Sequence, residues 1–146
     1  MKTNGGFLIS QIKQVQGRIF EKLLIKAGIE EFNGPQGRIL YVLWQEDNLP
    51  IVELSKRTGL AKTTLTSMLD RLENSGFLTR VFDKSDRRRV RIAITDMARS
   101  MRDKYNQVSD DMNKIFYKGF SEDEILQFES YLEKILDNLY KEENNK

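Results

Sequence analysis

Arg87, Arg88 and Arg89 lie together in a polar segment, residues 83–89, between two apolar stretches of the chain. A guanidinium group keeps its charge and sheds water readily, so it suits phosphate oxygens and the narrow, negative minor groove of DNA. The chain contains no Cys and no His, which removes thiolate nucleophiles, the usual proton shuttle and the commonest metal ligands. Glycine-rich phosphate loops and nucleophile elbows are absent as well. The sequence therefore predicts a binding protein, with no catalysis, metal or cofactor.

A second group of polar side chains shares one face of a predicted helix that begins at Ala61 or Thr63 and ends at Asn74, before Gly76. At about 100° per residue, the apolar residues gather on one side of this helix. They are Leu65, Met68, Leu69 and Leu72. The polar residues opposite or beside them are Thr63, Thr66, Ser67, Asp70, Arg71 and Asn74. Such a face is suited to reading DNA, whereas an ordinary surface helix would turn the same face toward water.

The elements around these two groups predict how they are positioned. Pro50 opens a short helix that Thr58 and Gly59 end, so two short helices meet across a tight turn, as in a helix-turn-helix. Apolar residues predict strands over 78–82 and 90–95, and the arginine segment forms the turn between them. A hairpin in this place is a wing. The alternative is a solvated turn whose charges discourage pairing at the edge of a sheet.

The residues before the helix pair carry their own start and stop signals. Apolar residues spaced by three and four predict a helix over 7–26, which Gly28 ends. A second helix follows, with Asn33 as its expected cap and Pro35 in its first turn. Residues 46–49 are expected to form a loop.

The net charge of +2 conceals an uneven distribution. Residues 56–91 contain ten basic and four acidic residues, a net charge of +6, and the remainder of the chain carries −4. A basic block inside a folded segment is a footprint of phosphate binding. The length of 146 residues and the 39% hydrophobic content suit one folded, soluble domain. With no apolar run of about 20 residues and no leader segment, the expected location is cytoplasmic, without a membrane partner.

Several of these landmarks occur together in one known family. The chain resembles the MarR family of winged-helix transcriptional regulators over nearly its whole length, most specifically from Leu49 to Ala98. The resemblance rests on Leu72-Glu73, Gly76, Phe77-Leu78, Arg80, Asp86-x-Arg88 and Ile94-Thr95. It implies that Arg88 enters the minor groove and that Asp86 orients the wing. The predicted DNA-binding residues are Lys62, Thr63, Thr64, Thr66, Ser67, Arg71, Asp86, Arg87 and Arg88.

The chain departs from the family pattern in two places. Many relatives have a basic residue where Ser67 stands, so Thr and Ser contacts to phosphates, thymine methyl groups or base edges must carry more of the recognition. The peroxide-sensing branch of the family has a similar recognition helix, but its sensing requires a cysteine in the first helix. This chain has no cysteine, which excludes thiol oxidation as its trigger.

Long amphipathic helices on both sides of the winged helix predict a homodimer. An apolar stripe from Met97 to Ile115 indicates a fifth helix, and the capping box Ser121-x-x-Glu124 begins a sixth. In the family the first helix and the last two interlock with a partner subunit, and two-fold symmetry places two recognition helices one DNA turn apart. Packing within the chain is the alternative use of these stripes. The predicted dimerisation residues are Leu8, Ile12, Val15, Ile125, Phe128, Leu132, Ile135 and Leu139.

The predicted fold class is mainly α, a winged helix-turn-helix with a small β-hairpin wing and long N- and C-terminal dimerisation helices. The expected segments are an N-terminal dimerisation helix (1–32), a DNA-binding lobe (33–98) and C-terminal dimerisation helices (99–146), which together form one intertwined domain. The predicted function is sequence-specific regulation of transcription, as a repressor that occupies a pseudo-palindromic operator in double-stranded DNA. The alternative is a winged-helix protein-interaction module whose basic face binds an acidic protein partner.

The family resemblance also implies a small aromatic or amphipathic effector that binds between the dimerisation helices and the DNA-binding lobe. Aromatic residues are expected to line such a cleft. The candidates are Phe20, Tyr41, Trp44, Phe116 and Tyr117. Aromatic side chains at helical spacing belong more often to a core than to a pocket, so core packing is the competing interpretation.

Overall fold

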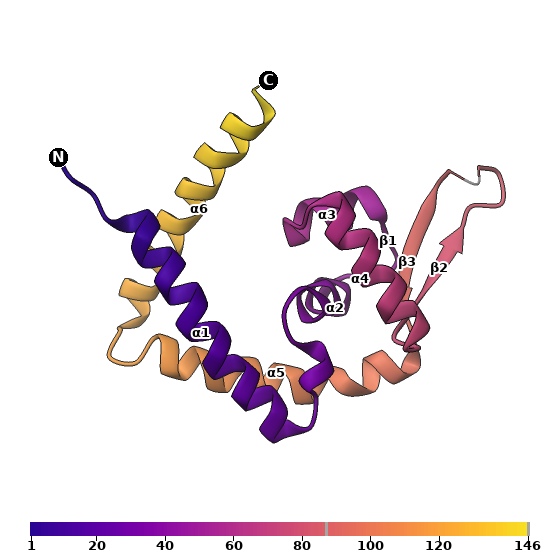
Figure 1. Ribbon diagram of the computed structural model, residues 1–146, viewed down its shortest axis with the longest axis horizontal. Helices are drawn as coiled ribbons and strands as arrows, with labels where there is room; N and C mark the ends of the chain where they lie inside the picture. Colours follow the sequence, from indigo (N-terminus) through magenta and orange to yellow (C-terminus); the bar gives the residue numbers. More distant parts are fainter. Residues whose placement is uncertain (87, 146) are drawn as a thin grey trace. The chain divides into compact units, whose positions relative to one another are not determined.

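The computed structural model describes residues 1–86 and 88–145 (Figure 1). Helices predominate, and the strands form one small antiparallel sheet, which confirms the predicted mainly α fold with a small β-hairpin. The chain divides into two compact units, Met1–Met112 and Asn113–Lys146. Within the described residues, no helix has both the length and the apolar character needed to cross a membrane.

The helices of the first unit begin and end close to the predicted positions. They are α1 (Gly5–Ala27), α2 (Pro35–Gln45), α3 (Ile51–Thr58), α4 (Lys62–Asn74) and most of α5 (Asp96–Phe116), and a short 3₁₀ helix, η1 (Glu30–Phe32), lies between α1 and α2. Gly28 ends α1 in the left-handed conformation, at φ 76°, as predicted. Pro35 occupies the first turn of α2, also as predicted.

The prediction that Asn33 caps α2 was wrong. The N-cap residue is Gly34, at φ 65°, and no side chain caps the helix. Asn33 instead closes η1, which the sequence did not predict, because its backbone N–H donates to the carbonyl oxygen of Glu30 at 3.2 Å. Since φ is positive at Gly34, the chain turns there without the cost that a Cβ atom would bring.

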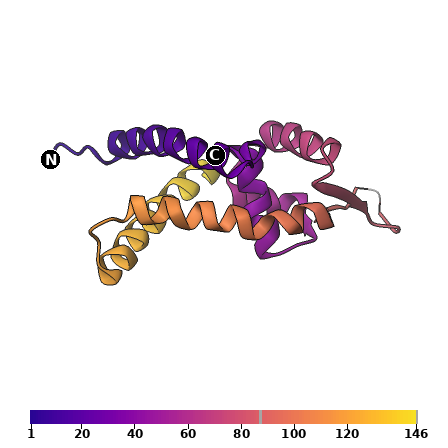
Figure 2. The ribbon, with the colours of Figure 1, turned by 90° about the horizontal axis from the view of Figure 1, so that it is seen from below.

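The sheet contains one strand more than the predicted hairpin. Its strands are β1 (Leu49–Pro50), β2 (Leu78–Phe82) and β3 (Val90–Ile94), in the order β1-β3-β2. The hairpin pairs Leu78 with Ile94 and Phe82 with Val90, and Figure 2 shows it projecting from the helices of its unit. Leu49 was expected in a loop but pairs with Ile92 in β1. A strand of two residues is too short to show alternation in the sequence.

The hydrophobic core of the first unit joins α2, α3, α4 and the sheet to the middle of α5. Leu43, Leu65 and Ile92 are fully buried in it, and Tyr105 and Val108 bring α5 into the same cluster. The apolar stripe of α5 therefore serves internal packing at these positions, while Met97 and Ile115 at its ends are exposed.

The second unit contains the end of α5 and α6 (Glu122–Asn144). The predicted capping box is present, because Ser121 Oγ accepts from the N–H of Glu124 at 3.1 Å and Glu124 Oε1 accepts from the N–H of Ser121 at 2.9 Å. Phe116, Tyr117 and Phe128 pack against one another at centroid distances of 4.9–6.5 Å. No residue of α6 is fully buried, and Ile135 and Leu139 are among its exposed apolar residues.

Candidate nucleic-acid interface

Helix α4 carries the predicted separation between a core face and a polar face. Gly59, at φ 69°, ends α3 and allows the tight turn that leads into α4. Leu65, Leu69 and Leu72 are each 1% exposed, whereas the side chains on the opposite side are exposed. We call Thr63, Thr66, Ser67 and Asp70 the polar face of α4. Thr64 is half-buried at its margin, and Lys62 and Arg71 are exposed beside it.

The hydroxyl group of Thr66 already has a partner for its proton. Thr66 Oγ1 donates to the carbonyl oxygen of Lys62 at 2.9 Å, one turn earlier in the helix. The residue is exposed, and its hydroxyl oxygen can still accept hydrogen bonds. Thr66 is therefore suited to accept a hydrogen bond from a cytosine or adenine amino group, or to touch a thymine methyl group.

Arg80 of β2 joins the hairpin to α4 through two carboxylates, a connection that the sequence did not predict. Arg80 Nη2 lies 2.8 Å from Asp70 Oδ1, and Arg80 Nη1 pairs with Glu73 Oε1. Burial opposes the charge of Arg80, but the hydrogen bonds to Asp70 and Glu73 outweigh it and raise its pKa. The pairing also neutralises Asp70, the acidic residue on the polar face of α4, and so reduces its repulsion of phosphate groups.

Two aspartates shape the turn of the hairpin. Asp83 Oδ1 accepts hydrogen bonds from the N–H and the hydroxyl of Ser85, at 2.9 and 2.8 Å, and these bonds lower the pKa of Asp83. Asp86 Oδ1 accepts from the backbone N–H of Arg88 at 3.0 Å and from its Nε at 3.2 Å. This geometry fits the predicted orienting role of Asp86. Arg87, a predicted DNA-binding residue, lies outside the described residues.

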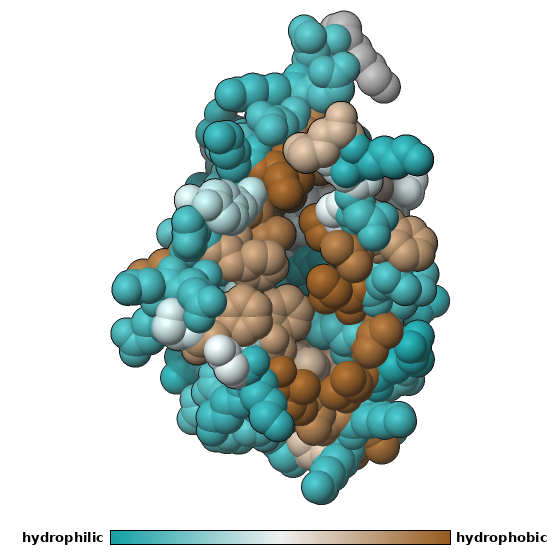
Figure 3. Space-filling view, turned by 90° about the vertical axis from the view of Figure 1, so that its left-hand side faces the viewer, coloured by the Kyte–Doolittle hydropathy of each residue, from teal (hydrophilic) through white to brown (hydrophobic). Residues whose placement is uncertain are grey.

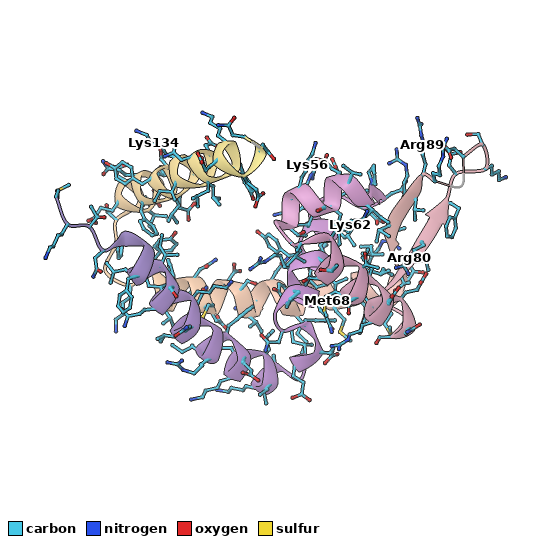
Figure 4. The ribbon with its side chains drawn as sticks, turned by 45° about the horizontal axis from the view of Figure 1, so that its top comes forward. Lys56, Lys62, Met68, Arg80, Arg89 and Lys134 are labelled. Atoms are coloured by element: carbon cyan, nitrogen blue, oxygen red, sulfur yellow. The ribbon has the colours of Figure 1, made fainter. Side chains whose placement is uncertain are left out.

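The arginines of the turn that the structure describes are open to solvent. The side chain of Arg88 is 92% exposed and that of Arg89 is 78% exposed. In Figure 4, Arg89 and Lys56 of α3 extend toward the same side of the first unit. Exposed cations from two elements thus lie on one side, which is the arrangement that a polyanion requires.

The predicted effector residues are divided between the two units of the chain. Phe20 and Trp44 both pack against Tyr105, at centroid distances of 5.9 and 5.1 Å, and Tyr41 is exposed nearby on α2. Trp44 Nε1 also donates to the carbonyl oxygen of Ala98 at 2.9 Å. Burial raises the pKa of Tyr105 to about 12, so its hydroxyl stays protonated. Phe116 and Tyr117 belong to the second unit instead.

Comparison with known proteins relates this arrangement to one family. Residues 32–90, from the end of η1 to the start of β3, match the MarR family model. The HTH-type transcriptional regulator TtmR of Methylorubrum extorquens is 40% identical over 88 residues, which are 60% of this chain and 44% of that protein. The chain spans 44–65% of the length of this protein and three further curated relatives.

Two solved structures share the fold over most of both chains. The PcaV transcriptional regulator of Streptomyces coelicolor, in complex with its natural ligand, is 26% identical with a TM-score of 0.80, over 92% of this chain and 93% of that one. A mutant MarR from E. coli, complexed with operator DNA, is 27% identical with a TM-score of 0.78, over 90% and 92%. The matched segment holds the helix pair and most of the hairpin described above, so this part of the chain is similar to the MarR family of winged-helix transcriptional regulators.

Proposed function

We propose that the chain is a sequence-specific DNA-binding regulator that represses transcription by occupying a two-fold symmetric operator. One observation carries the proposal most directly: the polar face of α4 is exposed beside a hairpin whose Arg88 and Arg89 side chains are open to solvent. In this proposal α4 enters the major groove and Arg88 enters the adjacent minor groove. The related structure of a mutant MarR in complex with operator DNA supports binding to DNA.

A homodimer is part of the proposal because apolar residues of α1 and α6 remain uncovered within the chain. Leu8, Ile12 and Val15 of α1 are exposed, as are Ile135 and Leu139 of α6. Figure 3 shows such apolar side chains among hydrophilic ones. Burying surface of this kind favours association. We therefore assign dimerisation to these residues together with the half-buried Ile125, Phe128 and Leu132, with segments 1–32 and 99–146 flanking the DNA-binding lobe at 33–98.

A small aromatic or amphipathic effector remains a proposal at the cluster around Tyr105. Phe20 and Trp44 contact that residue, and Tyr41 is exposed beside it. The bond from Trp44 to Ala98 links the cluster to the first turn of α5. The related PcaV structure with its natural ligand supports ligand-responsive regulation in the family. Phe116 contributes to such a site only if the effector also contacts the second unit.

Selection of bound duplexes from a random pool tests this function. We expect a two-fold symmetric consensus whose half-sites are about one helical turn, or 10 base pairs, apart. Binding to random duplex should weaken steeply with salt, because each phosphate contact releases counterions. Failure to bind any duplex at low salt would contradict the proposal and favour the module that binds an acidic protein.

Arg80→Met should weaken operator binding roughly tenfold, equal to about 1.4 kcal/mol. The substitution leaves the carboxylates of Asp70 and Glu73 without their cation, so Asp70 would repel the phosphate backbone. Adding Asp70→Asn should restore much of the affinity, as measured by fluorescence anisotropy. Arg99→Met is a matched control, because Arg99 also bridges two carboxylates, Asp47 and Asp96, at the start of α5. No recovery in the double variant would contradict the neutralising role.

Operator affinity should stay nearly constant between about pH 6 and 8 at fixed salt, because the usual titrating side chain of that range, histidine, is absent. The resolved pKa shifts agree with this expectation. The pKa values of Tyr105 and Tyr117 are raised to about 12, and that of Asp83 is lowered, so none of the three groups titrates in this range. Diamide should also have no effect, since there is no cysteine. Reversible loss of binding at micromolar peroxide would contradict the redox part.

A further inference from the structure

A groove of about 440 Å³ lies between the hairpin and the start of α3. Its walls include Val52 of α3 and Val81, Phe82 and Val90 of the hairpin. The volume falls in the range of about 300–1,000 Å³ that is typical of small-molecule sites. The groove is separate from the aromatic cluster around Tyr105, because the two share no lining residue.

The apolar walls of this groove are unusually open to water. Val52 is 68% exposed, Phe82 is 58% exposed and Val81 is 45% exposed. A single exposed apolar residue needs no explanation, but three that converge on one concave surface indicate a place where an apolar group binds. Neither the core nor the proposed contacts to DNA use these side chains.

The rim of the groove is positively charged. Arg88, Arg89 and Arg91 line it together with one carboxylate, that of Asp83. Arg91 Nη1 donates to the carbonyl oxygen of Asn48 at 3.0 Å. The side chains of Arg88 and Arg89 are mostly exposed, and each has only its Nε directed at Asp86, at 3.2 and 4.0 Å, so their terminal nitrogens make no ion pair with that carboxylate. Asp83 is engaged by Ser85, which satisfies part of its hydrogen-bonding capacity. An occupant with a negative charge is therefore favoured over a neutral one or a cation.

We propose that this groove binds a small amphipathic organic anion, whose apolar body lies on Val52, Val81 and Phe82 and whose anionic group is held by Arg88 and Arg89. Arg88 is also the residue assigned above to the DNA minor groove. Bound anion and DNA therefore compete for the same guanidinium group, a consequence that rests on the proposed function. Release of DNA by such an anion requires no movement between the two units of the chain.

Naphthalene-1-sulfonate is a suitable probe, because it combines a rigid apolar body with a permanent negative charge. Naphthalene-1-methanol is its neutral counterpart. In the absence of DNA, we expect the sulfonate to shift the methyl NMR signals of Val52, Val81 and Val90, and the alcohol to bind at least about tenfold more weakly. Val52→Gln and Phe82→Gln should each weaken sulfonate binding by a similar factor. Ile25→Gln, a matched change at an exposed residue of α1, should not.

The second arm measures displacement of a fluorescent random duplex by the sulfonate. We expect displacement from the wild type and much less from Val52→Gln, which changes no charge near the DNA. Three outcomes would contradict anion binding in the groove. They are equal binding of the two probes, unchanged sulfonate affinity in both groove variants, and NMR shifts confined to methyl groups near Tyr105. If the sulfonate binds the groove without displacing DNA, the proposed competition between anion and DNA for Arg88 is wrong, but the groove is still an anion-binding site. If the protein binds no duplex at all, the proposed function is wrong. The NMR measurement, which uses no DNA, would still show whether the groove binds the sulfonate.

Discussion

We expect the substitution Leu132→Asp to abolish operator binding, the largest effect of any variant considered, although Leu132 lies on α6, outside the helix pair and the hairpin. Leu132 is half-buried on the apolar stripe of α6, where Ile135 and Leu139 are exposed. In the dimer, a carboxylate at this position would be desolvated without a partner, which costs several kcal/mol and outweighs any gain at the surface. Sedimentation equilibrium should report a monomer or an unfolded chain, and anisotropy should detect no binding to the operator.

Ser130→Asp is the matched control, because it adds the same carboxylate to an exposed position on the opposite side of α6. We expect this variant to dimerise and to bind the operator like the wild type. The dimer proposal fails if Leu132→Asp stays folded as a monomer and binds a half-site with unchanged affinity, since folding, dimerisation and operator binding would then be separable.

The second large effect comes from the wing. Arg88→Ala should weaken binding to operator and random duplex alike, because it removes a cation from the negative potential of the minor groove. The slope of log affinity against log salt should fall by about 1 per subunit, and most of the discrimination between the two duplexes should survive. Since the side chain of Arg88 is 92% exposed, the substitution should leave the stability of the fold unchanged.

The double variant Thr66→Ala, Ser67→Ala should show the opposite pattern. Each lost base contact is worth about 1–3 kcal/mol of discrimination, so the gap between operator and random duplex should narrow with little change in salt slope. Thr66→Ala also removes the bond to the carbonyl oxygen of Lys62, but such bonds contribute little to helix stability.

Both sets of measurements require that the variants remain dimers, which sedimentation can verify before DNA is added. If Arg88→Ala leaves the affinity for random duplex and the salt slope unchanged, Arg88 is a solvated turn residue and its assignment to the minor groove is wrong. If the double variant lowers both affinities equally, the polar face of α4 positions the helix on phosphates and reads no bases.

The features that the sequence predicted well are set by nearby residues. Gly28 and Gly59 end their helices because the left-handed conformation costs glycine little, and Ser121 with Glu124 forms a capping box within four residues. The division of α4 into two faces follows from helical periodicity alone. The hairpin was also predicted from a local pattern, two apolar stretches around a polar turn. Only its last residue differed, because Thr95 donates its N–H to the carbonyl oxygen of Phe77 instead of extending β3.

The features that the sequence did not reveal depend on residues far apart in the chain. Leu49 forms part of strand β1 only because it pairs with Ile92 of β3, which lies 43 positions later in the sequence. Arg80 reaches Asp70 and Glu73 only after the chain has reversed direction at Gly76. In the aromatic cluster, Tyr105 connects Phe20 with Trp44, although its sequence position suggested a role in the α5 stripe. No local period encodes such contacts, since they arise from tertiary packing.

Trp44 gives the chain an intrinsic optical reporter. It is the only tryptophan among the 146 residues, and its indole N–H donates to Ala98 at the beginning of α5 while its ring contacts Tyr105. Indole emission depends on hydrogen bonding and on the polarity around the ring. Its wavelength should therefore change when α5 separates from α2, and this change can be measured without any added dye. An effector that enters the aromatic cluster would change this emission directly, whereas an anion in the groove at the hairpin would leave it unaltered.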